Sequence, residues 1–219
     1  PGDFRRQFEF LLSHHPHMVY VGLSRAVSGT LQSAEAAAKR GHAERIHIFD
    51  SANAAGGQGL LVIAAAEAAQ RGCSPTEIIG LLENLKAQTL TWACTTDVSH
   101  AVRGGRVPRW AGTVAGWFGL TALAQVSPDG RLAIKGGMIC KRNTVEKFAA
   151  YVAKRLDRNR AYRVIIGHCG DELAGQRLLV EFRRLVDCTE SWCVETGSAV
   201  GAHGGPGWLV ISVPPAGTR

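Results

Sequence analysis

The sequence predicts an α/β protein with two parts, a parallel sheet flanked by helices over residues 1–95 and a mixed α/β layer over residues 96–219. Three observations support this prediction. The length of 219 residues suffices for one large or two small domains. Strand-like and helix-like segments alternate through the first half, as they do in a parallel sheet with crossover helices. The second half contains a predicted hairpin, which requires antiparallel strands.

The chain begins with a helix and two strands joined by a second helix. Residues 3–15 are predicted to be helical, and the apolar segment HMVYVGL at 17–23 is predicted to be a buried strand. A short turn leads to a helix over 29–40, for which Ser28 is the expected N-cap. The segment RIHIF at 45–49 is the second strand.

Two helices and a third strand complete the predicted first part. An Ala-rich helix is expected over 59–71. The sequence Ser-Pro-Thr-Glu at 74–77 is a capping box with proline at the first helical position, and it begins a helix that ends near residue 88. The segment TLTWACT at 89–95 is predicted to be the third strand of the same sheet.

The second half is predicted to be mixed α/β. Its first segment is irregular, and the turn Pro-Asp-Gly at 128–130 then joins two strands in a hairpin. Asn143 is the expected N-cap of a helix that ends near residue 157. A strand over 162–167 and a helix over 171–186 follow. Two more strands are expected at 192–196 and 208–213.

The positive charge of the chain is confined to its second half. Lysine and arginine exceed aspartate and glutamate by 25 to 18, a net charge of +7. Residues 1–95 contain 8 basic and 8 acidic residues, and residues 96–219 contain 17 and 10. This distribution suits an anionic partner, such as nucleic acid, phosphate or an acidic protein surface, and it equally suits a solvated basic surface.

Several classes of protein are not expected from the sequence. The most apolar run, residues 59–66, reaches Glu67 after eight residues, whereas a membrane-spanning helix needs about 20. No signal peptide is visible. Most of the six cysteines lie in apolar surroundings, which suits buried free thiols, and we expect a cytoplasmic protein. The six cysteines lack C-x-x-C spacing, and they predict no metal site.

The first candidate site is Ser28-Gly29-Thr30, between a predicted strand and a predicted helix. The N-terminus of a helix presents free N–H groups and the positive end of its dipole, which favour a carboxylate or phosphate. The two hydroxyls add further donors. The alternative is an ordinary N-cap followed by a helical threonine.

The second candidate site is His203 in the segment Gly-Ala-His-Gly-Gly-Pro-Gly at 201–207. We expect this glycine-rich segment to be a loop, which lets the backbone approach a ligand closely while the imidazole donates or accepts a proton. The alternative is a turn with a surface histidine.

Two further motifs have functional and structural interpretations. Arginines 103, 106 and 109 lie in a loop that contains glycine and proline, which suits binding of phosphate or an acidic partner, or else a solvated basic loop. Asp50-Ser51 precedes the glycines 56, 57 and 59. Their spacing does not match the dinucleotide-binding pattern, so a structural turn is the better interpretation.

A catalytic arrangement is a third possibility. Ser28, His203 and Asp50 would form a Ser-His-Asp triad if the fold brought them together. The sequence lacks the G-x-S-x-G pattern that exposes a serine nucleophile on a sharp turn. An acyl hydrolase therefore remains an alternative without a supporting motif. A nucleic-acid-binding module is another alternative, supported by the net charge alone.

Taken together, the motifs resemble those of the DegV family of fatty-acid-binding proteins. The S-G-T-x-x-S-A and G-x-H-x-G-P-G stretches are each fairly specific, and their order and spacing make a chance match improbable. The matching stretches are 23–34 (LSRAVSGTLQSA), 49–51 (FDS) with the glycines that follow, 103–107 (RGGRV), 141–142 (KR) and 200–207 (VGAHGGPG).

The resemblance implies a parallel, Rossmann-like three-layer domain over 1–95 and a second mixed α/β domain over 96–219, with a long-chain fatty acid buried between them. It implies that the carboxylate is held by Ser28, Gly29, Thr30 and His203. The apolar residues 60–66 and 117–123 would enclose the tail.

The resemblance also implies a role in acyl transfer. The protein would be a bacterial carrier and not itself an enzyme, with no catalytic residue, no cofactor and no nucleic-acid partner. It would present the acid to an ATP-dependent kinase subunit that phosphorylates the carboxylate. Arg103, Arg106 and Arg142 would face that partner and the phosphate, and therefore matter for delivery more than for binding. The family's first strand and a Thr-Ser-x-Pro loop would precede Pro1, so about the first quarter of the family fold is expected to be missing.

Overall fold

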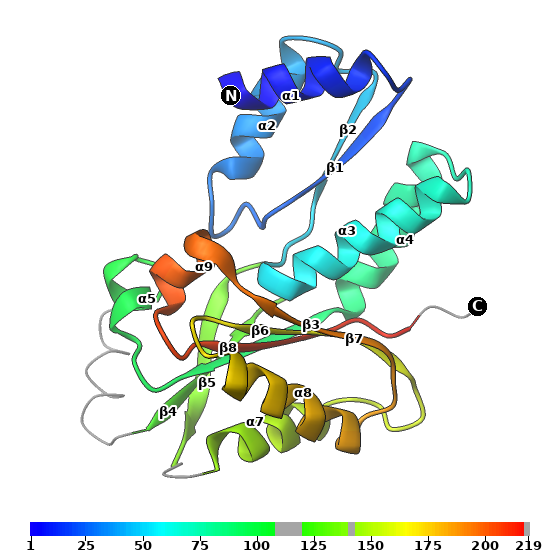
Figure 1. Cartoon of the computed structure of the whole chain (residues 1–219). Coiled ribbons are helices and arrows are strands. Elements are labelled where there is room, and N and C mark those ends of the chain that lie inside the picture. Colours follow the sequence, from blue (N-terminus) through cyan, green and yellow to red (C-terminus); the bar gives the residue numbers. More distant parts are fainter. Residues whose placement is uncertain (108–119, 140–142, 217–219) are drawn as a thin grey trace.

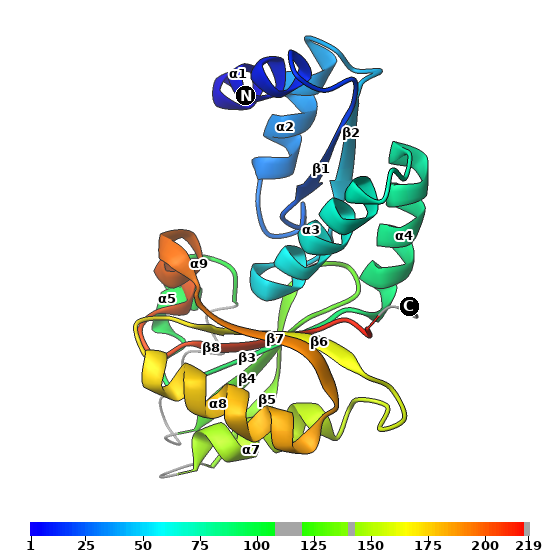
Figure 2. The same cartoon turned by 45° about the vertical axis from the view of Figure 1, so that its right-hand side comes forward.

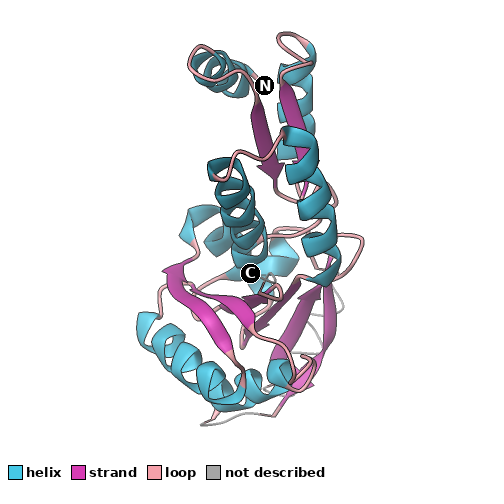
Figure 3. Cartoon of the chain, turned by 90° about the vertical axis from the view of Figure 1, so that its right-hand side faces the viewer, coloured by secondary structure: helices cyan, strands magenta, loops and turns pink. Residues whose placement is uncertain are grey.

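The strands of this chain form two separate groups (Figure 1, Figure 3). The computed structural model describes residues 1–107, 120–139 and 143–216. Within these residues one sheet has two strands and the other has six. The helices and strands are, in chain order, α1 (Gly2–Leu12), β1 (Met18–Gly22), α2 (Thr30–Lys39), β2 (Ile46–Asp50), α3 (Ala55–Gln70), α4 (Pro75–Gln88), β3 (Leu90–Thr95), α5 (Ser99–Arg103), β4 (Thr121–Val126), β5 (Leu132–Met138), α7 (Thr144–Ala153), β6 (Tyr162–His168), α8 (Glu172–Leu185), β7 (Cys188–Glu195), α9 (Gly197–Gly204) and β8 (Leu209–Val213).

The smaller sheet pairs β1 with β2 in parallel and has helices on both faces. Successive side chains of a strand point to opposite faces. Met18 and Tyr20 of β1 pack with α1 and α2, whereas Val19 and Val21 pack with α3 and α4. A strand covered on both faces is apolar at every position rather than at alternate ones, which explains the continuous apolar sequence of β1.

The larger sheet has the strand order β5-β4-β3-β8-β6-β7. Neighbouring strands are antiparallel except β6 and β7, which are parallel because α8 connects them across one face of the sheet. Helices α7 and α8 cover that face, and their fully buried Phe148 and Phe182 belong to the largest apolar cluster. Helices α3 and α9 lie on the other side (Figure 1).

Helix α3 lies between the two sheets (Figure 2). Leu61 and Ala64 pack with β1, β2 and α4. At the first turn, Gly56 lies so close to β6 and β8 that a Cβ atom would be 2.7 Å from Ile165 Cγ2 and 3.0 Å from Ser212 Cβ. The helix is therefore mostly apolar, because it packs on both sheets, and the exposed Val62 and Ala66 lie on its remaining side.

An ion pair secures α3 to the larger sheet. The guanidinium of Arg163 on β6 donates to both carboxylate oxygens of Glu67, over 2.8 and 2.7 Å, and donates to Glu190 of β7 over 2.5 Å. The side chain of Arg163 is only 15% exposed. A planar guanidinium matches a carboxylate in this two-point manner, which makes the contact directional.

The α/β class and most predicted elements are confirmed. The capping box at the start of α4 and the hairpin of β4 and β5 are present. Three helices differ from the prediction in their bounds. Helix α1 ends earlier, at Leu12, and α7 ends earlier, at Ala153. Helix α3 begins before the predicted start and includes three glycines.

The sheet predicted for residues 89–95 is wrong. Strand β3 does not join β1 and β2 but lies between β4 and β8, antiparallel to both. Packing explains the difference, because Trp92 and Cys94 are part of the core beneath α7 and α8. Strand pairing alone does not define a domain, so a division of the chain near residue 95 stays a prediction.

The first prediction concerns the close approach of α3 to the larger sheet. Gly56→Ala should lower the free energy of unfolding by about 1–3 kcal/mol, the cost of adding a methyl group to a packed core. Gly59→Ala is the matched control on the same helix, because its Cβ would meet only Ile165 Cδ1, at 3.5 Å. That variant should be neutral or stabilised by up to about 1 kcal/mol, since alanine favours helix more than glycine. Urea unfolding measures both, and equal effects would contradict the role given to Gly56.

Candidate functional site

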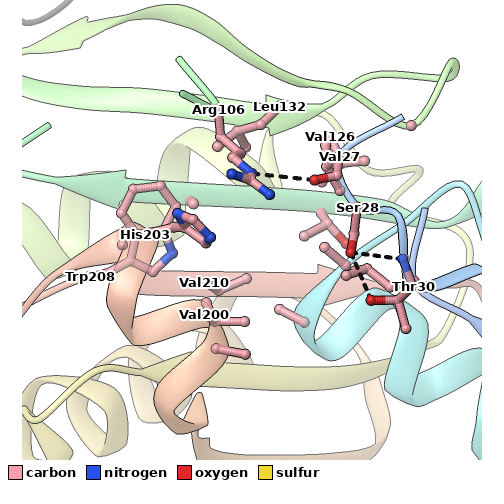
Figure 4. A pocket seen from close by; sticks show the side chains of 18 residues that line it. Val27, Ser28, Thr30, Arg106, Val126, Leu132, Val200, His203, Trp208 and Val210 are labelled. Carbon is pink, nitrogen blue, oxygen red and sulfur yellow. Dashed lines mark hydrogen bonds between the residues drawn. The ribbon is translucent and has the colours of Figure 1, made fainter. Parts of the chain in front are cut away.

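An apolar cavity of about 250 Å³ lies between the part of the protein that contains the smaller sheet and the part that contains the larger sheet. These two parts are called the two halves of the protein below. Figure 4 shows Ser28 and Thr30 on one side of it, His203 and Arg106 on the other, and the side chains of Val200 and Val210 between them. The lining residues come from the β1–α2 loop, the starts of α2 and α3, the segment after α5, the β4–β5 turn, strands β3, β4, β5 and β8, and helix α9 with the loop that follows it. They are Leu23, Val27, Ser28, Thr30, Ala54, Ala55, Thr91, Ala93, Arg106, Val126, Gly130, Leu132, Ala199, Val200, His203, Gly204, Trp208 and Val210.

Ser28 and Thr30 form a pair of hydroxyls at the start of α2. Their oxygens are 2.8 Å apart, and the backbone N–H of Thr30 donates to Ser28 Oγ over 3.2 Å. The predicted N-cap at Ser28 is wrong by one residue, because Gly29 is the N-cap. Glycine has no side chain for capping. The hydroxyl of Ser28 instead accepts a hydrogen bond from the backbone N–H of Thr30, two residues later.

His203 lies near the end of helix α9, not in the loop that its glycine-rich sequence predicted. The glycines serve close packing rather than flexibility. A Cβ on Gly204 would lie 2.7 Å from the ring of Trp208, and Gly205 has a φ of +78°, which ends the helix in the left-handed region. His203 is therefore held on a helix.

Two histidines interlock helices α5 and α9. The ring of His203 lies against Gly104, where a Cβ would be 2.2 Å from Nδ1. The ring of His100 in turn lies against Gly205, where a Cβ would be 2.6 Å from Cδ2. His203 Nδ1 is buried and has no hydrogen-bond partner among the described residues. This nitrogen faces Gly104 at the end of α5, and the side chain of His203 also lines the cavity.

The arginines of the R-G-G-R segment have different positions. Arg106 lines the cavity and donates from Nε to the carbonyl of Val27 over 3.3 Å and from Nη1 to that of Gly104 over 2.6 Å. Arg103 is exposed, does not line the cavity, and lies 3.3 Å from Ser99 Oγ. Arg109 and Arg142 are outside the described residues.

The β1–α2 loop is fixed by polar contacts on both sides. Ser24 is buried, and its hydroxyl donates to the carbonyl of Gly130 in the β4–β5 turn over 2.8 Å. Arg25 is paired with Asp50 and Glu35 over 3.1 and 2.6 Å. Both carboxylates keep the guanidinium charged, and they raise the pKa of Arg25 above its usual value. The loop is thus tied to both halves of the protein.

The segment after Asp50 has a structural role, as the spacing of its glycines indicated. Asn53 Oδ1 accepts from Thr91 Oγ1 over 2.7 Å, and a Cβ on Gly57 would lie 2.2 Å from that amide oxygen. Ala52 and Ala55 have φ values of +44° and +48°, which non-glycine residues adopt only at an energetic cost. The surrounding hydrogen bonds hold this strained backbone at the cavity edge.

The triad of Ser28, His203 and Asp50 is not assembled. Asp50 accepts from Arg25 and from the backbone N–H of Ala52, and it does not line the cavity. Within the described part of the chain, no carboxylate orients His203. Residues 60–66 and 120–123, expected to enclose an acyl tail, do not line this cavity, and residues 117–119 are outside the described part. Their contact with a tail stays a prediction.

Most of the apolar lining was not found from the sequence. Thr91 and Ala93 line the cavity, whereas Trp92 between them faces the opposite core. Strand alternation could have shown that Thr91 and Ala93 share a face. It could not have shown that Val126, Leu132 and Val210 meet them there, since this depends on the strand order.

The described residues contain neither a metal-binding cluster nor a membrane-spanning helix. No group of three or more histidine, cysteine, aspartate or glutamate side chains there is arranged to hold a metal ion. In the same residues, no helix has both the length and the apolarity needed to cross a membrane.

The family of the chain follows from a match along nearly its whole length. A model of the DegV family, described as uncharacterised proteins, matches residues 1–215. The chain therefore belongs to the DegV family. A DegV domain-containing protein of Streptococcus pyogenes is 25% identical over 216 residues, 97% of this chain and 74% of the relative. One of Clostridium perfringens is 26% identical over 199 residues, 91% of this chain and 70% of the relative.

Solved structures of DegV proteins have the same fold. A Thermus thermophilus protein, described for its fatty acid binding, has a TM-score of 0.88 and 25% identity, and the match covers 99% of this chain and 77% of that one. A Eubacterium eligens protein loaded with heptadecanoic acid has a TM-score of 0.85 and 16% identity, with 97% and 76% covered. DegV of Bacillus subtilis, described as a fatty acid binding protein, has a TM-score of 0.82 and 22% identity, with 98% and 76% covered.

The second prediction concerns the contact between Gly104 and His203. Gly104→Ala should displace the imidazole of His203 and lower the free energy of unfolding by about 1 kcal/mol. That is the low end of the cost of overpacking, because a ring can rotate away where backbone cannot. The imidazole signals in an NMR spectrum report the displacement. Gly80→Ala, on the exposed side of α4 with open space around its Cβ, is the control. Unchanged His203 signals in Gly104→Ala would show that the ring does not depend on this glycine.

Proposed function

We propose that this chain binds a long-chain fatty acid in the cavity between its halves, with the carboxylate at Ser28, Gly29, Thr30 and His203. The observation that carries the proposal is the composition of the cavity wall, which is apolar except for a small group of hydrogen-bonding side chains. An amphiphile with one polar end matches such a wall. The fatty acids bound by related DegV proteins support the same choice.

The apolar wall favours an acyl chain. Each methylene group transferred from water into such surroundings contributes about 0.8 kcal/mol. The cavity volume of about 250 Å³ lies just below the roughly 300–1,000 Å³ of most small-molecule sites. It therefore suits the head group and the first part of the chain, and we expect the cavity to lengthen when a long tail enters.

The hydroxyl pair is arranged to donate to a carboxylate. Ser28 Oγ accepts from the Thr30 amide, and it accepts from the Thr30 hydroxyl as well when that hydroxyl is the donor of the pair. Both lone pairs of Ser28 are then used, and its own proton remains free. An ionised carboxylate accepts hydrogen bonds and donates none. The same arrangement makes Ser28 a poor nucleophile, which weighs against an acyl hydrolase.

His203 completes the head-group site from the other half of the protein. Its side chain lines the cavity across from Ser28 and Thr30 (Figure 4). A carboxylate taken from water needs hydrogen bonds in compensation, because burying it without partners is costly. A ligand oxygen that accepts from an N–H of the imidazole gains such a hydrogen bond.

The chain would act as a carrier and not itself as an enzyme. We propose that a bacterial ATP-dependent kinase subunit phosphorylates the bound carboxylate in the cytoplasm. Arg103 supports this role, because it is exposed near the cavity and its charge is available to a partner or a phosphate. Arg106 and Arg142 are the other candidates for contact with that partner.

The third prediction tests the head-group site. Ser28→Ala and His203→Ala should each weaken fatty acid binding roughly tenfold to a hundredfold, because a hydrogen bond to a charged group contributes about 1.5–3 kcal/mol. Titration with a fluorescent fatty acid gives the dissociation constants. Ser33→Ala is the matched control, since its hydroxyl donates to the Gly29 carbonyl on the same helix and should not affect binding. Unchanged affinity in both site variants would place the carboxylate elsewhere.

Native mass spectrometry provides a separate test of binding itself. Protein made in lipid-replete cells should carry one fatty acid per chain, detectable as a mass that organic extraction removes. A mass that survives extraction and unfolding and maps to Ser28 would instead indicate an acyl-enzyme.

The fourth prediction separates delivery from binding. Arg103→Ala should leave the lipid content unchanged, because the side chain is not part of the cavity wall. Phosphorylation of the bound acid by the kinase should fall by about tenfold, the effect expected from one lost charge-assisted hydrogen bond. Arg184→Ala, an exposed arginine of α8 on the opposite side of the larger sheet, is the control and should leave phosphorylation unchanged. Loss of lipid in Arg103→Ala would indicate a structural role for the loop.

A further inference from the structure

A second pocket lies where helices α7 and α8 end, away from the apolar cavity. Its volume is about 340 Å³, within the range of roughly 300–1,000 Å³ that is typical of small-molecule sites. In Figure 1 these helix ends lie on the other side of the larger sheet's half from α5 and α9. The lining residues are Ala150, Ala153, Lys154, Leu156, Asp157, Arg158, Arg160, Arg184, Leu185, Val186 and Asp187.

This second pocket is lined by more cations than anions. Four of its side chains are positively charged and two are carboxylates, which leaves a net charge of +2. The cations are Lys154, Arg158, Arg160 and Arg184, and the carboxylates are Asp157 and Asp187. The pocket therefore contains part of the positive charge that the second half of the sequence carries, and the fatty acid site does not use this part.

Most of this positive charge is not neutralised by the described residues. Within them, Lys154 and Arg158 form no ion pair. Arg160 donates from Nη1 to the side-chain oxygen of Gln88 over 3.0 Å, and this acceptor is uncharged. Of the four cations, Arg184 alone is paired with a carboxylate, which lies on its own helix at 2.7 Å. Three cations of the pocket thus keep their charge for a ligand.

The two carboxylates of the pocket do not cancel these charges by direct contact. In the described part of the chain, neither Asp157 nor Asp187 is in an ion pair. Oδ1 of Asp157 instead accepts from the backbone N–H of Asn159 over 2.9 Å, which shapes the loop between α7 and β6. The carboxylates weaken the attraction for an anion without removing it.

The helix ends explain only some of these cations. A positive side chain is favoured near the C-terminus of a helix, because the helix dipole is negative there. Lys154 is the C-cap of α7, and Arg184 is in the last turn of α8. Arg158 and Arg160 lie in the α7–β6 loop, beyond both helices, so the dipoles do not account for them. A guanidinium binds two oxygens of a phosphate at once, which makes arginine well suited to such a ligand.

We propose that this second pocket binds a small phosphate-bearing molecule that is free in solution, with its phosphate groups held by Lys154, Arg158 and Arg160. All three side chains are exposed, so water screens each contact and a ligand with several negative charges is favoured over one with a single charge. The pocket is recessed between two helix ends, which a small molecule enters more readily than the flat surface of a membrane. This site is independent of the proposed fatty acid site.

The test uses inorganic triphosphate as the ligand, titrated into the whole chain in a calorimeter at low ionic strength. The wild type should bind it with a dissociation constant below about 1 mM. Arg158→Gln should weaken binding about threefold to tenfold, because one screened charge contact is lost. The double variant Arg158→Gln with Arg160→Gln should bind still more weakly. Added salt should weaken binding to the wild type as well.

Two further variants control the comparison. Arg177→Gln removes the same charge from the exposed face of α8, outside the pocket, and should leave the affinity within about twofold of the wild type, because solvent screens a distant charge. Asp187→Asn removes a carboxylate from the lining and should strengthen binding about threefold, because its repulsion of the ligand is lost. Circular dichroism and urea unfolding show that each variant is folded.

A second titration distinguishes a soluble ligand from a lipid head group. It uses vesicles of phosphatidylglycerol, with vesicles of uncharged phosphatidylcholine as the control. Weaker triphosphate binding in Arg158→Gln, with unchanged binding in Arg177→Gln, supports the inference. Equal weakening in both would overturn it, since the overall charge would then attract the anion. No triphosphate binding at about 1 mM, with or without binding to phosphatidylglycerol vesicles, would overturn it too.

Discussion

The close packing of α3 against both sheets is the constraint on which the rest of the structure depends. Its apolar residues cover β1 and β2 on one side, while Gly56 and Gly57 allow its first turn to touch β6, β8 and Asn53 on the other. Arg163 then fixes the far part of the helix through Glu67. Because the helix packs on both sheets, their positions are linked, and the cavity forms where they meet.

Two hydrogen bonds beside the cavity also connect the β1–α2 loop with the half that contains the larger sheet. Ser24 donates to the β4–β5 turn, and Arg106 donates to the loop that carries Ser28. These contacts use backbone carbonyls as acceptors, so they fix the path of the chain more than the identity of any side chain. The side chains of Ser28 and Thr30 are therefore placed by a loop with little freedom, which is what a preorganised polar site needs.

Local sequence signals were enough for most elements, and they also pointed to Ser28, Thr30 and His203, which line the cavity. The capping box of α4 and the Pro-Asp-Gly turn depend on nearby residues alone, and both were predicted correctly. The sheet of β3 was predicted wrongly, because its apolar sequence fits either sheet and the choice depends on α7 and α8, which follow in the chain. The glycines around His203 suggested a loop. They are instead required by contacts with Trp208 and His100, which only the folded structure reveals.

The positions of Ser28 and His203 have a thermodynamic consequence. Ser28 belongs to a loop next to the smaller sheet, and His203 belongs to a helix that packs on α5 beside the larger one. A ligand that touches both residues forms a bridge between the two halves, and its binding energy adds to their association. At a free concentration one hundred times its dissociation constant, such a ligand stabilises the folded state by about 2.7 kcal/mol. If the chain binds such a ligand, its supply and the stability of the fold form a single linked equilibrium.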